Sequence, residues 1–128
     1  MRFMMIMIPN IPDEADWTPT AQNAEAVAAM TKFNAELTKA GILLSLDGLH
    51  PGSKGARVAF SGGRASVTDG PFTEAKELIG GYWLIQAKSK QEAVEWATRC
   101  PAADGDVIEV RQVYEMSDFP PEVQAAAQ

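Results

Sequence analysis

Two predicted β-strands, each apolar on both faces, constrain the fold of this chain most strongly. The first spans Phe3 to Ile8 and the second spans Gly80 to Ala87. Alternate residues of a strand point to opposite faces of its sheet, and bulky apolar side chains occupy both sets of positions here. Such strands need cover on both faces. We therefore expect helices on one face of the sheet and a second copy of the chain, in a homodimer, on the other.

The segment after the first strand predicts a long helix. Thr18 or Thr20 is the expected N-cap, and the helix runs to about Ala40, where Gly41 ends it. Apolar residues recur along one face of this helix and are expected to face the core. That face comprises Val27, Met30, Asn34 and Leu37, with Phe33 at its border.

A second helix is predicted after the second two-faced strand. Ser89 followed by Glu92 has the spacing of a capping box. Each predicted helix is followed by a predicted strand: residues 42–46 follow the first helix, and residues 107–114 follow the second. The expected buried side of the second helix comprises Ala93, Val94, Trp96, Ala97 and Cys100.

The middle of the chain predicts a β-hairpin. Residues 57–61 and 64–68 flank Gly62-Gly63, which has the length and composition of a two-residue hairpin turn. The element order is thus β-α-β, hairpin, β-α-β. This order predicts an α+β fold, ferredoxin-like with an antiparallel sheet, in one domain at 1–116 followed by a C-terminal tail at 117–128.

Composition excludes several functional classes. The formal net charge is −6 and the basic residues are scattered, which argues against nucleic acid binding. The apolar run after Arg2 is too short to span a membrane and lacks a signal cleavage site. The single cysteine, Cys100, fits a reducing compartment, and packing is its expected role. We therefore expect a cytoplasmic protein without membrane or nucleic acid partners.

A turn at Asp69-Gly70-Pro71 provides the first candidate site residue. Gly70 accepts positive φ and Pro71 fixes φ near −65°, so the chain turns sharply after the hairpin. A carboxylate on such a fixed corner suits binding or acid-base chemistry. Asp69 is therefore a candidate catalytic base or orienting carboxylate. The alternative is that Asp69 only caps its own turn.

Charged residues follow this corner. Glu74 and Glu77 share a face if 73–78 forms a helical turn, and with Asp69 they could raise one carboxyl pKa and produce a base. They could equally form a solvated surface. The expected ligand-binding residues here are Phe72, Glu74, Lys76 and Glu77.

The only histidine, His50, is the second catalytic candidate, because an imidazole transfers protons near neutral pH. It follows a predicted strand and precedes Pro51, so it is expected at the rim of the cleft near Asp69. Zinc is not expected, since the chain has one histidine and one cysteine, far apart. A divalent cation held by Asp69 and the glutamates is the less favoured alternative. Dinucleotide and Walker motifs are absent from the sequence, so no cofactor is expected.

Several strings resemble the DGPF subfamily of YCII-related proteins. They are DGPFTEAKELIGGYWLI, SKQEAVEWATRCP, VIEVRQVYEM, and the N-terminal MRFMMIMI and FNAELTKAGILLSLDGLHP. The resemblance covers Met1 to about Met116 and implies a dimeric α+β barrel. The chain also resembles more distant relatives that act by proton transfer, and some YCII-like members among them use a His-Asp pair whose histidine lies on the first helix. That helix has no histidine here, so the pair is not transferred.

The resemblance leaves two functional expectations. In the first, a small-molecule site near the DGPF motif binds an organic compound and supports acid-base chemistry of an isomerase or lyase type. In the second, the chain is a non-catalytic regulatory or interaction module, because genes of this subfamily often neighbour those of extracytoplasmic-function sigma factors.

Overall fold

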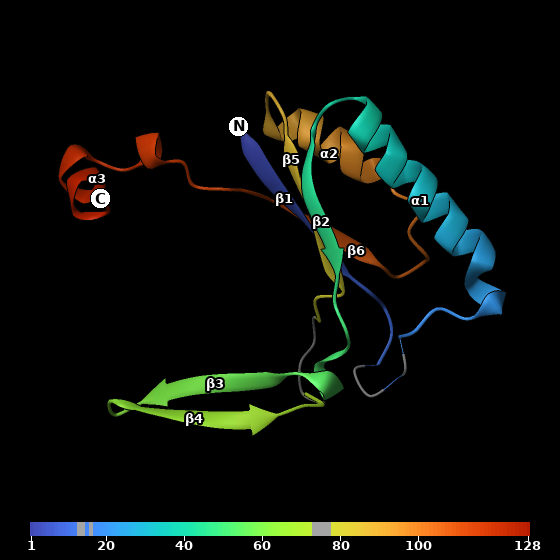
Figure 1. The fold of residues 1–128 in the computed structure, drawn as a ribbon, viewed down its shortest axis with the longest axis horizontal. Helices are drawn as coiled ribbons and strands as arrows, with labels where there is room; N and C mark the ends of the chain where they lie inside the picture. Colours follow the sequence, from blue (N-terminus) through green and yellow to red (C-terminus); the bar gives the residue numbers. More distant parts are fainter. Residues whose placement is uncertain (13–14, 16, 73–77) are drawn as a thin grey trace.

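The computed structural model describes residues 1–12, 15, 17–72 and 78–128 (Figure 1). The main part of the fold is one sheet packed against two helices. Its elements are β1 (Arg2–Ile8), α1 (Ala24–Lys39), β2 (Leu43–Gly48), β5 (Gly81–Gln86), α2 (Lys90–Thr98) and β6 (Val107–Gln112). The sheet order is β2-β5-β1-β6, and all neighbouring strands are antiparallel. This arrangement confirms the α+β, ferredoxin-like fold.

The core lies between the sheet and the two helices. Both helices cover the same face of the sheet (Figure 1). Phe33 of α1 meets Trp83 of β5 edge to face, with ring centres 5.8 Å apart. The Trp83 indole nitrogen also donates a hydrogen bond of 2.7 Å to Asn34 Oδ1. The buried residues of this core are Phe3, Met5, Phe33, Leu37, Trp83, Ile85, Ala87 and Ala93.

The opposite face of the sheet carries a half-buried apolar stripe. Met4 lies opposite Leu84, and Ile6 lies opposite Tyr82, across the two central strands. The Tyr82 hydroxyl donates to Asp47 Oδ2 at 2.9 Å, and this bond raises the pKa of Tyr82. α1 and α2 lie on the other face of the sheet (Figure 1). We call these four apolar residues, Met4, Ile6, Tyr82 and Leu84, the open face.

The predicted hairpin is confirmed. Strands β3 (Ala56–Ser61) and β4 (Arg64–Asp69) pair around Gly62 and Gly63, whose φ angles are 58° and 76°. They form a separate two-stranded sheet. Figure 1 shows the hairpin projecting from one end of the main sheet, away from the helices.

The C-terminal segment projects in the same direction from the other end of the sheet. It contains a short 3-10 helix and α3 (Pro121–Ala126). Glu115 fixes its base through a two-bond contact with Arg2, in which Nε lies 2.7 Å from Oε1 and Nη2 lies 3.1 Å from Oε2. The strand predicted at 107–114 ends earlier, at Gln112.

Several boundaries and faces differ from the sequence expectations. α1 begins at Ala24, because a short 3-10 helix occupies 21–23 after Thr20. Val27 is 44% exposed and therefore not part of the core, since the N-terminal end of α1 projects away from the sheet (Figure 1). Val94 on α2 is also exposed, although it was expected on the buried side of this helix. The predicted cap of α2 is confirmed, because the Glu92 amide donates a hydrogen bond to the Ser89 hydroxyl. Within the described part of the chain, no helix has the length and apolar character needed to cross a membrane.

Candidate functional site

The ends of β1, β2 and β5 meet next to His50. The Leu49 amide donates to the Gly80 carbonyl at 2.9 Å, and the Gly80 amide donates to the Met7 carbonyl at 2.8 Å. Gly81 lies so close to β2 that an added Cβ would sit 2.8 Å from the Asp47 carbonyl oxygen. Gly81 thus allows the two strands to approach closely, and His50 follows this junction directly.

Trp17 faces this junction from the loop between β1 and α1. Its indole nitrogen donates to the Pro12 carbonyl at 3.0 Å, which fixes the ring. An added Cβ on Gly80 would lie 3.7 Å from the ring, so the indole rests close to the strand ends. The ring is half-buried.

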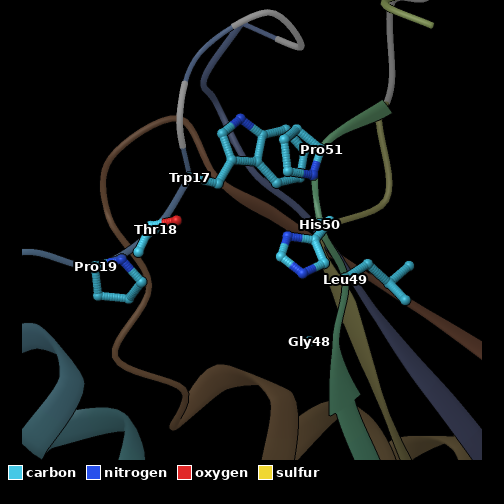
Figure 2. A pocket seen from close by; sticks show the side chains of 7 residues that line it. All are labelled: Trp17, Thr18, Pro19, Gly48, Leu49, His50 and Pro51. Carbon is cyan, nitrogen blue, oxygen red and sulfur yellow. The ribbon is translucent and has the colours of Figure 1, made fainter. Parts of the chain in front are cut away.

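Two adjoining cavities share Trp17 and His50. The first has a volume of about 270 Å³ and extends along the strand end and the segment that precedes α1. Figure 2 shows the His50 imidazole on the side of its strand that faces Trp17 and Pro19. Its lining residues are Trp17, Thr18, Pro19, Gly48, Leu49, His50 and Pro51.

The second cavity lies between Trp17, His50 and the base of the hairpin. Its volume is also about 270 Å³. Its described walls are mostly apolar, with His50 and Arg57 as the ionisable groups. The described lining residues are Trp17, His50, Gly52, Ala56, Arg57, Phe72, Leu78 and Ile79. We call the two cavities together the His50 site.

Arg57 and Phe72 form one wall of the second cavity. The guanidinium carbon lies 4.0 Å from the centre of the Phe72 ring, which is the geometry of a cation–π contact. Arg57 is exposed, and the ring face supports its guanidinium. The described walls, which are mostly apolar and include one guanidinium and one imidazole, suit a small anionic organic compound.

The DGP corner positions this wall. Gly70 packs directly against the Gly52 carbonyl, where an added Cβ would overlap the backbone. The Gly70–Pro71 peptide bond is cis. The Gly70 amide donates to the Gly55 carbonyl at 3.1 Å, so the corner joins the end of β4 to the loop after His50. Phe72, which follows the corner, lines the second cavity.

The predicted site residues have different outcomes. His50 and Phe72 line one cavity together. Asp69 is exposed at the end of β4, opposite Ala56 in the hairpin register, and lines neither cavity of the His50 site. Its catalytic role stays a prediction. Glu74, Lys76 and Glu77 lie outside the described residues, as does most of the helical turn expected at 73–78.

Trp17 and Arg57 were not expected in the site. Trp17 belongs to an irregular, proline-rich loop that has no periodic signal. Arg57 could have been found, because the hairpin prediction starts at this residue and His50-Pro51 precedes it closely. Its contact with Phe72 depends on the fold of the intervening corner.

Cys100 lies away from this site, against α1. Its sulfur is 3.9 Å from the Met30 sulfur, and burial raises the pKa of the thiol to about 11. A thiol with this pKa is protonated at neutral pH and is a poor nucleophile. Among the described residues, no group of histidine, cysteine or acidic side chains has an arrangement that would hold a metal ion.

Comparison with known sequences identifies the family. The profile of the YCII-related domain matches residues 1–117. This chain belongs to the YCII-related family. It is also 39% identical over 59 residues to a protein of Rhizobium meliloti (strain 1021) that is described as uncharacterized. That match covers 46% of this chain and 48% of the relative, so it spans about half the length of each.

Proposed function

We propose that this YCII-related protein binds a small organic anion in the His50 site and transfers a proton to or from it. The observation that carries the proposal is the shared placement of His50, Trp17, Arg57 and Phe72 around one cavity of about 270 Å³. This volume is near the lower end for small-molecule sites, so a compound of about one ring is the expected size.

Each side chain has a distinct task in this proposal. Arg57 provides charge-assisted hydrogen bonds to the anion. Trp17 and Phe72 provide apolar walls that exclude water and strengthen those bonds. His50, at the boundary of the two cavities, is the proton donor or acceptor. Asp69, which is the first residue of the corner that positions Phe72, is proposed as the catalytic base or an orienting carboxylate. We also propose that the chain belongs to the DGPF subfamily, because Asp69 to Phe72 form this string.

We further propose a cytoplasmic homodimer in which a second copy covers the open face. The support is the apolar stripe of Met4, Ile6, Tyr82 and Leu84, which the chain's own helices leave uncovered (Figure 1). Because self-complementary dimers bury the same patch from both copies, one surface suffices. The half-buried thiol of Cys100 fits a reducing compartment.

Ligand screening with matched arginine variants tests the binding proposal. A library of small organic acids is screened by saturation-transfer NMR, and the Kd of each hit is then measured for Arg57→Gln and Arg99→Gln. Arg99 is the control because its guanidinium also lies over an aromatic ring, Trp96, at 4.4 Å, but on α2. Arg57→Gln should weaken binding at least 10-fold, and Arg99→Gln should leave it unchanged. Equal effects of the two variants would contradict the proposal.

A non-catalytic interaction module, linked to a sigma-factor pathway, is the second candidate. The exposed apolar side chains of the hairpin favour it, because such patches mark protein interfaces. The variant His50→Gln separates the two functions once a ligand is known. Proton transfer predicts that ligand isomerisation or isotope exchange is lost while binding persists. An interaction module predicts no exchange in the wild-type protein.

A further inference from the structure

The hairpin has an exposed apolar face that its own chain does not cover. Val58 lies opposite Val67, and Phe60 lies opposite Ala65, so these four side chains share one face. Val58, Val67 and Phe60 are 53%, 68% and 80% exposed. An isolated two-stranded hairpin is only marginally stable in water. This face therefore needs a partner.

The C-terminal segment has a matching apolar surface. Tyr114 is 73% exposed and stacks on Phe119, with ring centres 5.0 Å apart and planes at 29°. Val123 on α3 is exposed as well. The contact between Glu115 and Arg2 fixes the base of this segment against β1. An anchored aromatic pair thus projects from the sheet.

The two surfaces carry opposite charges. The hairpin and its approach, residues 54–69, contain Lys54, Arg57 and Arg64 and one acidic residue, Asp69, and are therefore positively charged overall. Residues 113–128 contain Glu115, Asp118 and Glu122 and no basic residue. Since charge complementarity selects and orients partners, the hairpin fits the C-terminal segment in both polarity and charge.

Within one chain these surfaces are far apart. Figure 1 shows the hairpin and the C-terminal segment at opposite ends of the sheet, and both project on the side away from the helices. A two-fold axis that is parallel to the sheet and perpendicular to its strands would bring the open faces of two copies together. The same axis would place each hairpin beside the C-terminal segment of the other copy, in two identical contacts.

We propose that each hairpin docks on the C-terminal segment of a second copy of this chain. Val58, Phe60 and Val67 would then cover Tyr114 and Phe119 of the partner subunit. The inference rests on the homodimer proposed above. It has a consequence for the His50 site, because Arg57 lies at the base of the hairpin that the partner would hold in place.

Substitutions of apolar side chains on the two surfaces test this contact. Phe60→Ser and Tyr114→Ser are prepared separately and together; both side chains are exposed. Each single variant removes apolar area from both contacts of its dimer. Sedimentation velocity should show the dimer Kd raised at least 10-fold for each single variant. The double variant should be weakened by less than the two effects combined, because both side chains belong to the same contact.

Controls separate this contact from the open face. Val94→Ser, which removes an exposed apolar side chain from α2, should leave the Kd unchanged. Circular dichroism verifies that each variant is folded. Single variants that associate like the wild type, or single effects that add fully in the double variant, would overturn the proposal while a dimer sensitive to Leu84→Asp remained. A monomeric wild type would overturn the homodimer as well.

Discussion

The Arg57 guanidinium lies 4.0 Å from the centre of the Phe72 ring, which joins the hairpin to the segment after the DGP corner. The two residues are brought together by the hairpin turn and by the packing of Gly70 on Gly52. One wall of the His50 site therefore depends on the contact between Arg57 in the hairpin and Phe72 after the corner. The strength of this contact can be measured.

A double-mutant cycle measures that contact. Arg57→Ala, Phe72→Leu and the double variant are compared by urea unfolding. We expect a coupling energy of about 0.5–1 kcal/mol, as is typical of a cation–π pair near the surface. The cycle of Arg99→Ala and Trp96→Leu provides a reference pair. Independent effects of the Arg57 and Phe72 substitutions would contradict the contact.

Gly70 is expected to tolerate no side chain. Gly70→Ala should destabilise the protein by about 1–3 kcal/mol, because the new methyl group overlaps the Gly52 carbonyl. Gly55→Ala is the matched control, since its Cβ would meet the same oxygen at an ordinary 3.6 Å. Thermal unfolding of the two variants tests this difference. Similar melting temperatures would show that the corner is not closely packed.

Asn34 is expected to matter through the Trp83 indole. Asn34→Leu removes the acceptor 2.7 Å from the indole nitrogen and leaves a buried donor unpaired, at a cost of about 1–3 kcal/mol. The double variant Asn34→Leu with Trp83→Phe should recover part of this loss, because neither partner then remains unpaired. Urea unfolding gives both values. A loss that is equal with and without the indole would argue against the bond.

The Cys100 thiol should react slowly. With a pKa of about 11, roughly one thiol in 1,000 is ionised at pH 8, so alkylation should be on the order of 100-fold slower than for an unperturbed cysteine. Iodoacetamide labelling followed by mass spectrometry measures the rate in native and urea-unfolded protein. Equal rates in the two states would contradict the raised pKa.

The contact between Glu115 and Arg2 predicts an acid-sensitive C-terminal segment. The hydrogen bond from Arg2 lowers the pKa of Glu115 below its ordinary value of 4.5. Because the folded-state pKa is depressed, the contribution of the pair is present above pH 4.5 and is lost as the pH falls through the folded value. NMR titration of the Glu115 carboxyl should show this shift, and Arg2→Gln should abolish it. An unshifted carboxyl in the wild type would refute the contact.

The strands, the hairpin and the Ser89 cap were predictable because local patterns determine them. Alternation in β1 and β5 and the two glycines of the hairpin act over a few residues. The site was only half predictable. His50 and Phe72 were expected, but Trp17 and Arg57 reach the cavity through contacts between distant segments, which periodicity does not record. The prediction that Val27 faces the core was wrong for a similar reason, since the exposure of Val27 depends on where α1 extends beyond the sheet.

The most direct test of the His50 site is the response of the tryptophan indole signals to a bound organic acid. In ¹⁵N-resolved NMR, titration with a hit from the acid library should shift the Trp17 indole signal and leave the Trp96 signal unchanged. At the same ligand concentration, the Trp17 shift should be smaller in Arg57→Gln, because this variant is expected to bind the acid at least 10-fold more weakly. A ligand that binds while the Trp17 signal stays fixed, or that shifts it equally without Arg57, would contradict the account.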